Sequence, residues 1–201
     1  MIAIIDYGMG NLRSVSKALE HLGASYRFCS KGKDLVGASK VILPGVGAFG
    51  DAMKELKARN LLGPIADLLG HKTKLMGICL GLQLFFEKSE ENPGVEGLSV
   101  FKGSVRKFRS KTVKIPHMGW NDLKIVKKHP LLEGIECGEY FYFVHSYFGK
   151  PAVSQLALAT CQYGREDFDA VIGNEHVFAT QFHPEKSQEA GLRILKNFIR
   201  W

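Results

Sequence analysis

The chain has 201 residues and a formal net charge of +7, with 45% hydrophobic and 23% charged residues. These values are ordinary for a globular protein and exclude a wholly disordered or fibrous one. The length favours a single domain over residues 1–201, large enough to fold without a disulfide or metal. The N-terminal segment lacks the basic start of a signal peptide, and the longest nearly apolar run, 75–86, is too short to span a bilayer. Four cysteines without a C-x-x-C pair argue against a zinc ribbon or a disulfide scaffold, so we expect a reduced, cytoplasmic protein.

The positive charge is concentrated in one segment. Residues 102–128 contain nine Lys or Arg and one acidic residue, Asp122, which gives +8. The remaining 18 basic and 19 acidic residues sum to −1. A basic nucleic-acid-binding protein is therefore a weaker interpretation than a nearly neutral core that carries one basic segment.

The first half of the chain alternates short apolar runs with segments of helical periodicity. Strands are predicted at 1–6, 26–29, 40–43 and 75–78, with Pro44-Gly45 ending the third. Helices are predicted where Leu12, Val15, Ala18, Leu19 and Leu22 share one face before Gly23, around Met53 and Leu56, and over 61–69 and 80–88. This alternation is typical of βαβ units, so we expect a parallel sheet covered by helices on both faces.

The second half has a different pattern. Short apolar runs at 105–108, 123–126, 140–144, 156–161, 170–172 and 177–182 are separated by Gly, Pro and Asn, and they predict antiparallel strands that extend or flank the first sheet. Leu192, Leu195 and Ile199 recur at helical spacing and predict a closing helix. The expected fold class is α/β, with a mostly parallel central sheet, flanking helices and an antiparallel extension.

The clearest chemical signal is the segment Gly77-Ile78-Cys79-Leu80-Gly81. A predicted strand leads into Cys79 and a predicted helix leaves it, which is the nucleophile-elbow pattern with cysteine as the nucleophile. In so sharp a turn, side chains at the flanking glycines would collide with neighbouring elements. The N-terminal N–H groups of the following helix favour the reactive thiolate. A buried cysteine at an apolar strand–helix junction is the alternative explanation.

A thiolate nucleophile needs a partner that carries its proton. His183 and Glu185 are two residues apart at the end of a predicted strand, so both side chains project to the same side. Glu185 could then fix the imidazole tautomer, as the third member of a catalytic triad does. A solvated turn over 182–187 is the alternative, but its coexistence with the elbow favours catalysis.

The turn Pro44-Gly45-Val46-Gly47 is the predicted oxyanion stabiliser, with backbone N–H groups there and at Leu80 as donors. The stretch 45–50 also matches the G-x-G-x-x-G pattern of dinucleotide-binding turns. It follows the third predicted strand instead of the first, and Asp67, about 20 residues further on, falls in a predicted helix. Dinucleotide binding is therefore the less favoured alternative, and we expect neither a cofactor nor a metal.

Together these motifs resemble the class I (triad) glutamine amidotransferases. The likeness is strongest to one branch of that family, the glutaminase subunits of imidazole glycerol phosphate synthases, and it covers essentially the whole chain. It is carried by segments 6–12, 43–50, 77–84, 116–121, 142–147 and 181–187, of which 43–50 and 116–121 are the most specific. Leu82 is a small departure, where methionine is expected, and it affects no catalytic position. The resemblance implies a class I glutamine amidotransferase-like fold.

The resemblance also implies the hydrolysis of L-glutamine to L-glutamate and ammonia through a cysteine thioester. Cys79, His183 and Glu185 would be nucleophile, proton carrier and orienting carboxylate. The implied oxyanion donors are the backbone N–H groups of Val46 and Leu80. Residues implied to hold glutamine are Gly47, Gln83, Ser146 and Tyr147; Gln83 follows Cys79 by one helical turn and so shares its face.

Members of this branch act with a partner, a (β/α)₈-barrel cyclase subunit that takes up the ammonia and forms imidazole glycerol phosphate and AICAR in L-histidine biosynthesis. The resemblance thus implies a heterodimer, with the loop Gly45–Gly47 misaligned until the partner and its ligand are bound. The residues predicted to face that partner are Asn11, Trp120, Asn121, Tyr142 and Lys186. Trp120 is the foremost of them because tryptophan is enriched at interfaces, and its alternative is an ordinary core tryptophan.

The basic segment leads into 116–121, which suggests that it steers or seats an acidic surface of the cyclase. A solvated hairpin is the alternative. A paralogue that supplies ammonia for the amidation of a surface sugar would share almost every motif, and the sequence separates the two poorly.

Overall fold

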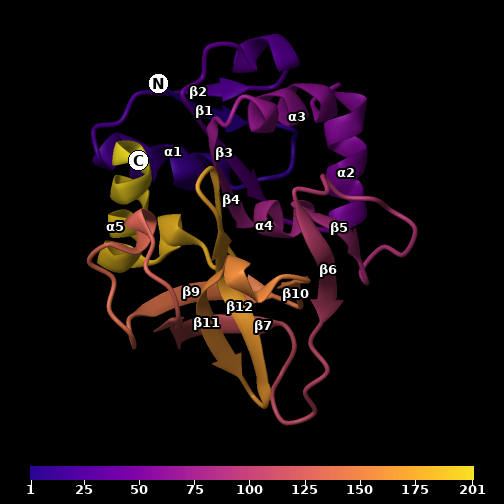
Figure 1. The fold of residues 1–201 in the computed structure, drawn as a ribbon, viewed down its shortest axis with the longest axis vertical. Helices are drawn as coiled ribbons and strands as arrows, with labels where there is room; N and C mark the ends of the chain where they lie inside the picture. Colours follow the sequence, from indigo (N-terminus) through magenta and orange to yellow (C-terminus); the bar gives the residue numbers. More distant parts are fainter.

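The computed structural model describes all residues 1–201, and its central element is an eight-stranded sheet (Figure 1). The strand order is β2-β1-β3-β4-β13-β12-β11-β8. The parallel part comprises β2 (Tyr26–Cys29), β1 (Ile2–Ile5), β3 (Lys40–Gly45), β4 (Lys74–Cys79) and β13 (Val177–Thr180). The antiparallel part comprises β12 (Glu166–Gly173), β11 (Ala157–Tyr163) and β8 (Lys124–Ile125). The predicted fold class is confirmed, including the antiparallel extension.

Two smaller sheets lie beyond the carboxyl ends of the parallel strands (Figure 1). One consists of β10 (Tyr147–Pro151), β6 (Phe101–Lys107) and β5 (Phe86–Ser89). The other is the antiparallel pair of β7 (His117–Asp122) and β9 (Tyr140–His145). Ligands of open α/β sheets bind at the carboxyl edge, so these small sheets build walls around the place where a site is expected.

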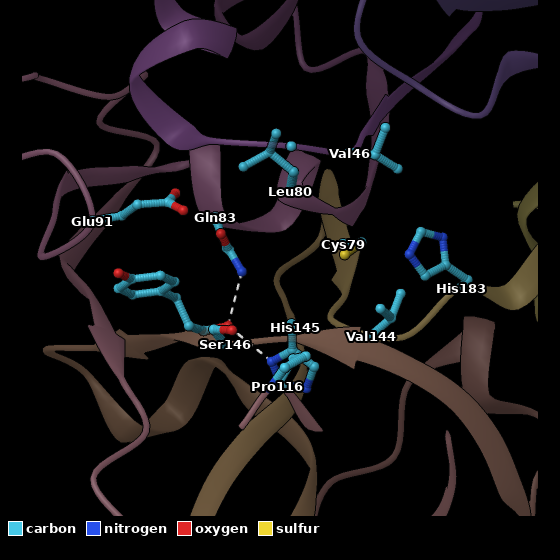
Figure 2. A pocket seen from close by; sticks show the side chains of 12 residues that line it. Val46, Cys79, Leu80, Gln83, Glu91, Pro116, Val144, His145, Ser146 and His183 are labelled. Atoms are coloured by element: carbon cyan, nitrogen blue, oxygen red, sulfur yellow. Dashed lines mark hydrogen bonds between the residues drawn. The ribbon is translucent and has the colours of Figure 1, made fainter. Parts of the chain in front are cut away.

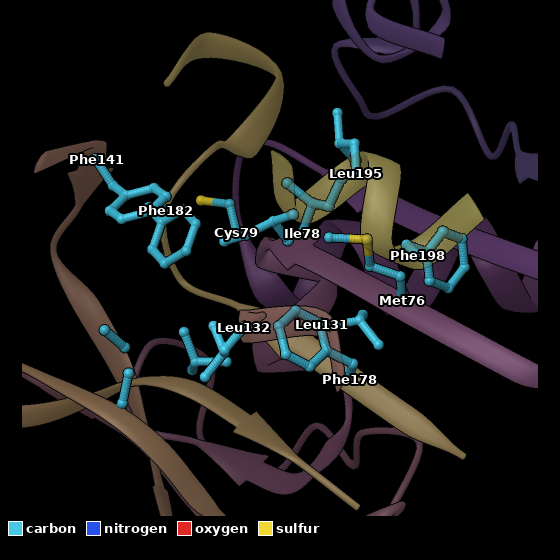
Figure 3. Packing of buried hydrophobic residues seen from close by; sticks show 14 of the residues in the cluster. Met76, Ile78, Cys79, Leu131, Leu132, Phe141, Phe178, Phe182, Leu195 and Phe198 are labelled. Carbon is cyan, nitrogen blue, oxygen red and sulfur yellow. The ribbon is translucent and has the colours of Figure 1, made fainter. Parts of the chain in front are cut away.

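Helices cover both faces of the parallel strands, which gives the molecule two apolar cores. Helices α1 (Leu12–His21) and α5 (Gln188–Arg200) bury one core, and α2 (Phe49–Ala58) and α3 (Leu62–Gly70) bury the other. Figure 3 shows Leu195 and Phe198 of α5 against Met76 and Ile78 of β4. Because successive strand residues point to opposite faces, Ile2 and Ile4 enter the first core while Ala3 and Ile5 enter the second. None of the helices combines the length and the hydrophobicity that a membrane-spanning helix requires.

Two element boundaries differ from the prediction in ways that shape the site. Pro44-Gly45 does not end β3, which continues in register with β4 until Gly45 lies opposite Cys79. The helix predicted over 80–88 is also wrong: α4 (Leu80–Leu84) ends early, and β5 follows it in parallel pairing with β6. The aromatic run at Phe85-Phe86 suits a strand buried between elements as well as it suits a helix, so periodicity alone could not separate the two.

Strands β7 and β10 were not predicted, and β6 and β12 begin earlier than expected. The inward side of β7 carries His117, Gly119 and Asn121, while Met118 and Trp120 point outward. Its polar residues therefore lie inside and its large apolar residues outside, which is the reverse of the usual strand pattern. This reversal explains why the strand was missed.

Candidate active site

Cys79 occupies the junction between β4 and α4 with a φ of +55°, a left-handed conformation that is unfavourable for a non-glycine residue. The two flanking glycines allow this turn. A Cβ at Gly77 would lie 2.6 Å from the Phe85 ring, and one at Gly81 would collide with the carbonyl oxygen of Leu43. The crowding expected from the sequence is thus present on both sides of the nucleophile.

His183 reaches Cys79 because β13 is parallel to β4 and ends beside it, with Thr180 opposite Ile78. Figure 2 shows the His183 ring beside the Cys79 sulfur. The Nδ1 atom of His183 lies 2.8 Å from Oε1 of Glu185, and both side chains are buried. The Nε2 atom of His183 is buried without a hydrogen-bond partner. The imidazole is therefore oriented by the carboxylate and presents its other nitrogen to the cysteine.

The surroundings of His183 favour its protonated form. Burial alone would lower its pKa, but the charge of Cys79, together with the hydrogen bond and charge of Glu185, raises the pKa to about 10. An imidazolium held between a sulfur and a carboxylate is the partner that a thiolate requires. The arrangement can support nucleophilic attack by Cys79 and subsequent proton delivery by His183.

A cavity of about 410 Å³ opens at Cys79, within the range of small-molecule sites (Figure 2). Its lining residues are Val46, Gly47, Cys79, Leu80, Gln83, Glu91, Pro116, Val144, His145, Ser146, Tyr147 and His183. Every residue predicted to hold glutamine or the oxyanion lies in this lining. The glycine-rich stretch 45–50 thus contributes to the cysteine site, and Gly47 has a φ of +98° that favours glycine.

Gln83 is held by two hydrogen bonds that its sequence position does not reveal. Its Nε2 atom donates to the backbone oxygen of Tyr147 at 2.9 Å and to Oε1 of Gln181 at 3.2 Å. Gln181 is fully buried, and its Nε2 atom lies 3.7 Å from the Cys79 sulfur. Gln181 was missed as a site residue, although it belongs to a segment that carries the family resemblance.

Glu91 was also missed, because it follows a strand that the sequence did not predict. Its carboxylate lines the cavity, and Oε2 accepts the backbone N–H of Phe49 at 2.8 Å. A carboxylate at the wall of a cavity can pair with an ammonium group of a bound molecule. No group of three His, Cys, Asp or Glu residues is placed to hold a metal ion.

The residues predicted to face a partner divide into two sets. Trp120 and Tyr142 lie opposite each other on β7 and β9, and the Nζ atom of Lys186 lies 5.8 Å from the centre of the Tyr142 ring. Asn11 caps α1 by accepting the N–H of Ser14. Asn121 projects from the inward side of β7, where its Nδ2 atom contacts His117 and the backbone oxygen of Gln162.

Two buried histidines, His117 and His145, are kept neutral by their surroundings. Burial lowers the pKa of His117 to about 4 and is the main cause that lowers the pKa of His145 to about 3. In the unfolded chain both would titrate near 6.5. The unfolded state thus binds more protons below that pH, and folding stability depends on pH in this range.

Above pH 6.5 both histidines are neutral in the folded and the unfolded state, so their contribution to the free energy of unfolding should not change with pH there. We expect the free energy of unfolding to fall as the pH drops from 6.5 towards 4. Each histidine would contribute a slope of about 1 kcal/mol per pH unit. Urea unfolding over this range measures the total slope, and His117→Phe should make it shallower. An identical slope in that variant would contradict the assignment of a neutral His117.

The whole chain matches known glutamine amidotransferases. Residues 3–201 match the family model described as glutamine amidotransferase class-I. The chain is 49% identical over 199 residues to the imidazole glycerol phosphate synthase subunit HisH of Methanocaldococcus jannaschii, covering 99% of this chain and 98% of the relative. It is 50% identical over 198 residues to the corresponding subunit of Caldanaerobacter subterraneus, covering 98% and 97%.

Solved structures with the same fold include a glutamine amidotransferase at a TM-score of 0.78 and 19% identity, covering 100% of this chain and 98% of the other. The glutaminase domain of Trypanosoma brucei CTPS, with bound acivicin, matches at a TM-score of 0.64 and 17% identity, covering 99% and 93%. Identities this low support the fold alone. The match of the family model and the near-50% identity to the HisH subunits show the family as well as the fold. The chain therefore belongs to the class-I glutamine amidotransferase family and, within it, to the HisH subunits of imidazole glycerol phosphate synthases.

Proposed function

We propose that this chain is a single glutamine amidotransferase domain that hydrolyses L-glutamine at Cys79 and supplies the ammonia to a cyclase subunit of imidazole glycerol phosphate synthase. The observation that carries the proposal is the constellation of Cys79 at a strained elbow and the buried His183–Glu185 pair, beside one cavity. The acceptor of the ammonia follows from the likeness to the HisH subunits.

In the proposed reaction the Cys79 thiolate attacks the side-chain amide carbon of glutamine. Backbone N–H groups of Val46 and Leu80, two residues of the cavity lining, stabilise the negative oxygen. His183 gives its proton to the departing ammonia and then accepts one from the water that hydrolyses the γ-glutamyl thioester. Glu185 keeps the ring oriented throughout.

The cavity offers neutral polar groups and one carboxylate to the rest of the substrate. Gln83, Ser146, Tyr147 and Gly47 are the proposed polar contacts, and the Glu91 carboxylate suits the α-ammonium group of glutamine. The loop Gly45–Gly47 is the element that we propose to adjust on partner binding. The exposed side chain of Val46 and the positive φ of Gly47 support a peptide that is free to change orientation.

The outward side of the β7–β9 pair is the proposed docking face for the (β/α)₈-barrel cyclase. Met118, Trp120 and Tyr140 on this side are 63%, 46% and 59% exposed, which is unusual for large apolar side chains. Val144, on the same side of β9, also lines the Cys79 cavity. A partner on this face would therefore cover the cavity mouth and keep ammonia away from water, where it would be protonated.

The other predicted contacts fit this face unequally. Tyr142 and Lys186 belong to it. Asn11 and Asn121, whose side chains also make hydrogen bonds within the chain, stay predicted contacts at or beside this face. The basic residues of 102–128 are all exposed, and Arg109 pairs with Glu90 at 3.0 Å. We propose that they steer an acidic surface of the cyclase, with a solvated surface as the alternative.

The four cysteines are free, which suits a reducing cytoplasm.

The proposal is tested by measuring glutamate release from the full chain with and without the cyclase subunit and a ligand of the cyclase. We expect strong stimulation by the liganded cyclase, and we expect Cys79→Ala to abolish glutamate release while the complex still forms. A γ-glutamyl adduct detected on Cys79 by mass spectrometry would identify the intermediate. Full activity of Cys79→Ala would refute the nucleophile, and absence of stimulation would favour a paralogue with another ammonia acceptor.

We expect Trp120→Ala to weaken binding of the cyclase subunit by at least about tenfold, because tryptophan is enriched among the interface residues whose truncation costs about 2 kcal/mol or more. Titration calorimetry or surface plasmon resonance would measure the affinity. Val153→Ala removes a similarly exposed apolar side chain outside the β7–β9 pair and serves as the matched control. Equal affinities for Trp120→Ala and the unmodified chain would place the docking face elsewhere.

A further inference from the structure

A chain of hydrogen bonds runs along the inward side of the β7–β9 pair to the cavity. Nδ2 of Asn121 lies 3.2 Å from Nε2 of His117, and Nδ1 of His117 lies 3.1 Å from Nε2 of His145. Nδ1 of His145 lies 2.8 Å from the backbone oxygen of Tyr147. The register that places His117 opposite His145 makes this contact possible.

The direction of every bond in this chain follows from its two ends. The carbonyl of Tyr147 can only accept, so Nδ1 of His145 carries the hydrogen. At the other end, Nδ2 of Asn121 also donates to the backbone oxygen of Gln162 while Oδ1 accepts the N–H of Asp122, which fixes the amide orientation. Nε2 of His117 must therefore accept, and its Nδ1 must donate to His145.

This assignment leaves one protonation state for the pair. Both imidazoles are neutral and both carry their hydrogen on Nδ1. A protonated His145 would donate from both nitrogens and force His117 to accept at both of its own, which a neutral imidazole cannot do. The lowered pKa values of both rings agree with this conclusion.

Aromatic rings hold the two imidazoles in place. The His117 ring stacks between Tyr163 and Phe143, at centroid distances of 4.0 and 4.7 Å. The His145 ring contacts Phe108 and Phe168, each at 5.2 Å. With both rings clamped, neither is free to turn and exchange its donor for its acceptor.

The chain ends at a carbonyl that also holds Gln83. The Tyr147 oxygen accepts from both His145 and Gln83, so its two lone pairs are occupied. The second Nε2 hydrogen of Gln83 goes to Gln181, whose own Nε2 lies near the Cys79 sulfur. Both donors of Gln83 are therefore used inside the chain, and its Oε1 remains as the atom able to accept from a bound molecule.

We propose that His117 and His145 are positioning residues that form a one-directional relay, fixing the Tyr147 carbonyl and through it the amide orientation of Gln83. Because the carbonyl that the relay holds can only accept, Gln83 turns Nε2 towards it and presents its acceptor oxygen to the substrate, which selects for an N–H group at that place in the cavity. This inference rests on the proposed glutaminase function for the identity of the substrate. The relay itself is independent of that function.

The first experiment determines the two tautomers in the free, full-length chain. Two-bond ¹H–¹⁵N spectra of ¹⁵N-histidine-labelled protein distinguish neutral Nδ1–H from neutral Nε2–H and from imidazolium. We expect neutral Nδ1–H signals for His117 and His145, assigned by their loss in His117→Phe and His145→Phe. Either residue in the Nε2–H or imidazolium form would overturn the relay, whether or not the chain hydrolyses glutamine.

The second experiment separates positioning from simple packing by using two substitutions of His117. Asparagine places an amide near the Nδ1 position and keeps a donor for His145, but it removes the stacked ring. Phenylalanine keeps the ring between Phe143 and Tyr163 but removes the donor. In a Cys79→Ala background, calorimetry measures the dissociation constant for glutamine with the liganded cyclase present, and urea unfolding of the free chain measures stability.

We expect the two measurements to rank the variants in opposite order. His117→Phe removes the hydrogen bond to His145 and so releases the Tyr147 carbonyl that fixes Gln83. This variant should raise the dissociation constant about tenfold, while His117→Asn stays close to the parent. Stability should fall more in His117→Asn than in His117→Phe. His129→Phe, which replaces a half-buried histidine away from the cavity, should leave glutamine binding unchanged.

Glutamine affinity that follows stability across the variants would reduce the relay to packing and overturn the positioning role. If no variant, nor the Cys79→Ala parent, bound glutamine, the proposed function would fail. The tautomer spectra would still decide whether the relay exists.

Discussion

Replacing Glu185 with glutamine is expected to lower kcat for glutamate release by about 10³-fold or more, comparable to the loss of the orienting carboxylate in other triads. The 2.8 Å hydrogen bond from Nδ1 of His183 would be kept, because the side-chain oxygen of a glutamine can also accept from the ring. The negative charge would be lost. Glu185 is one of the groups that raise the pKa of His183 to about 10, so in this variant the pKa should fall and less imidazolium should be present.

The measurement is kcat at saturating glutamine as a function of pH, with the liganded cyclase present. Because the imidazolium is lost as pH rises through the lowered pKa, the loss of activity should deepen towards alkaline pH. Glu189→Gln, which removes an exposed charge from the first turn of α5, is the control. An unchanged kcat in Glu185→Gln would show that the carboxylate is not needed to orient or charge His183.

The substitution Gly81→Ala is expected to lower the free energy of unfolding by about 3 kcal/mol or more, a large part of the 5–15 kcal/mol typical of a domain. The added methyl group would collide with the Leu43 carbonyl in the middle of β3, where backbone pairing with β4 prevents retreat. The strain would fall on the same turn that holds Cys79. We therefore expect activity to be lost together with stability.

Urea unfolding followed by circular dichroism would measure this loss. Gly70→Ala is the matched control, since Gly70 is the last residue of α3 and a Cβ there meets nothing within 4 Å. At a helical position this change should leave the free energy of unfolding unchanged or raise it by up to about 1 kcal/mol. Equal unfolding midpoints for Gly81→Ala and the unmodified chain would mean that β3 and α4 can separate at little cost.

The parts of the site that the sequence predicts are those in which local geometry restricts residue choice. The elbow is legible because only glycine fits beside Cys79. The pairing of His183 with Glu185 is also predicted, but the expected extended backbone is wrong. Strand β13 ends at Thr180, and the 3₁₀ turn Pro184–Lys186 brings the Glu185 carboxylate to Nδ1 of His183. The parallel half of the sheet is predicted for a similar reason, since strands buried on both faces must be apolar throughout.

The parts that the sequence does not predict depend on contacts between distant segments. Gln181 and Glu91 are polar residues without a local signature, and only the assembled cavity gives them a place beside Cys79. The inward orientation of Asn121 depends on which side of β7 faces the core, and Gly119 together with the polar His117 hides that alternation. Short apolar runs such as 80–88 are ambiguous because helix and strand bury them equally well.

The opposite orientations of neighbouring residues along β7 and β9 have a consequence for how such chains can diverge. Deleting one residue within either strand would exchange the two sides, turning Trp120 or Tyr142 inward and a relay histidine or Phe141 towards the proposed docking face. A substitution on the outward side changes only that side, so it can accompany changes in a partner protein. A change in strand length would reverse the orientation of the inward residues as well, so the length of each strand is constrained by both sides. Insertions and deletions among related chains should therefore accumulate in the connections 109–116 and 126–139 and be absent from 117–122 and 140–145.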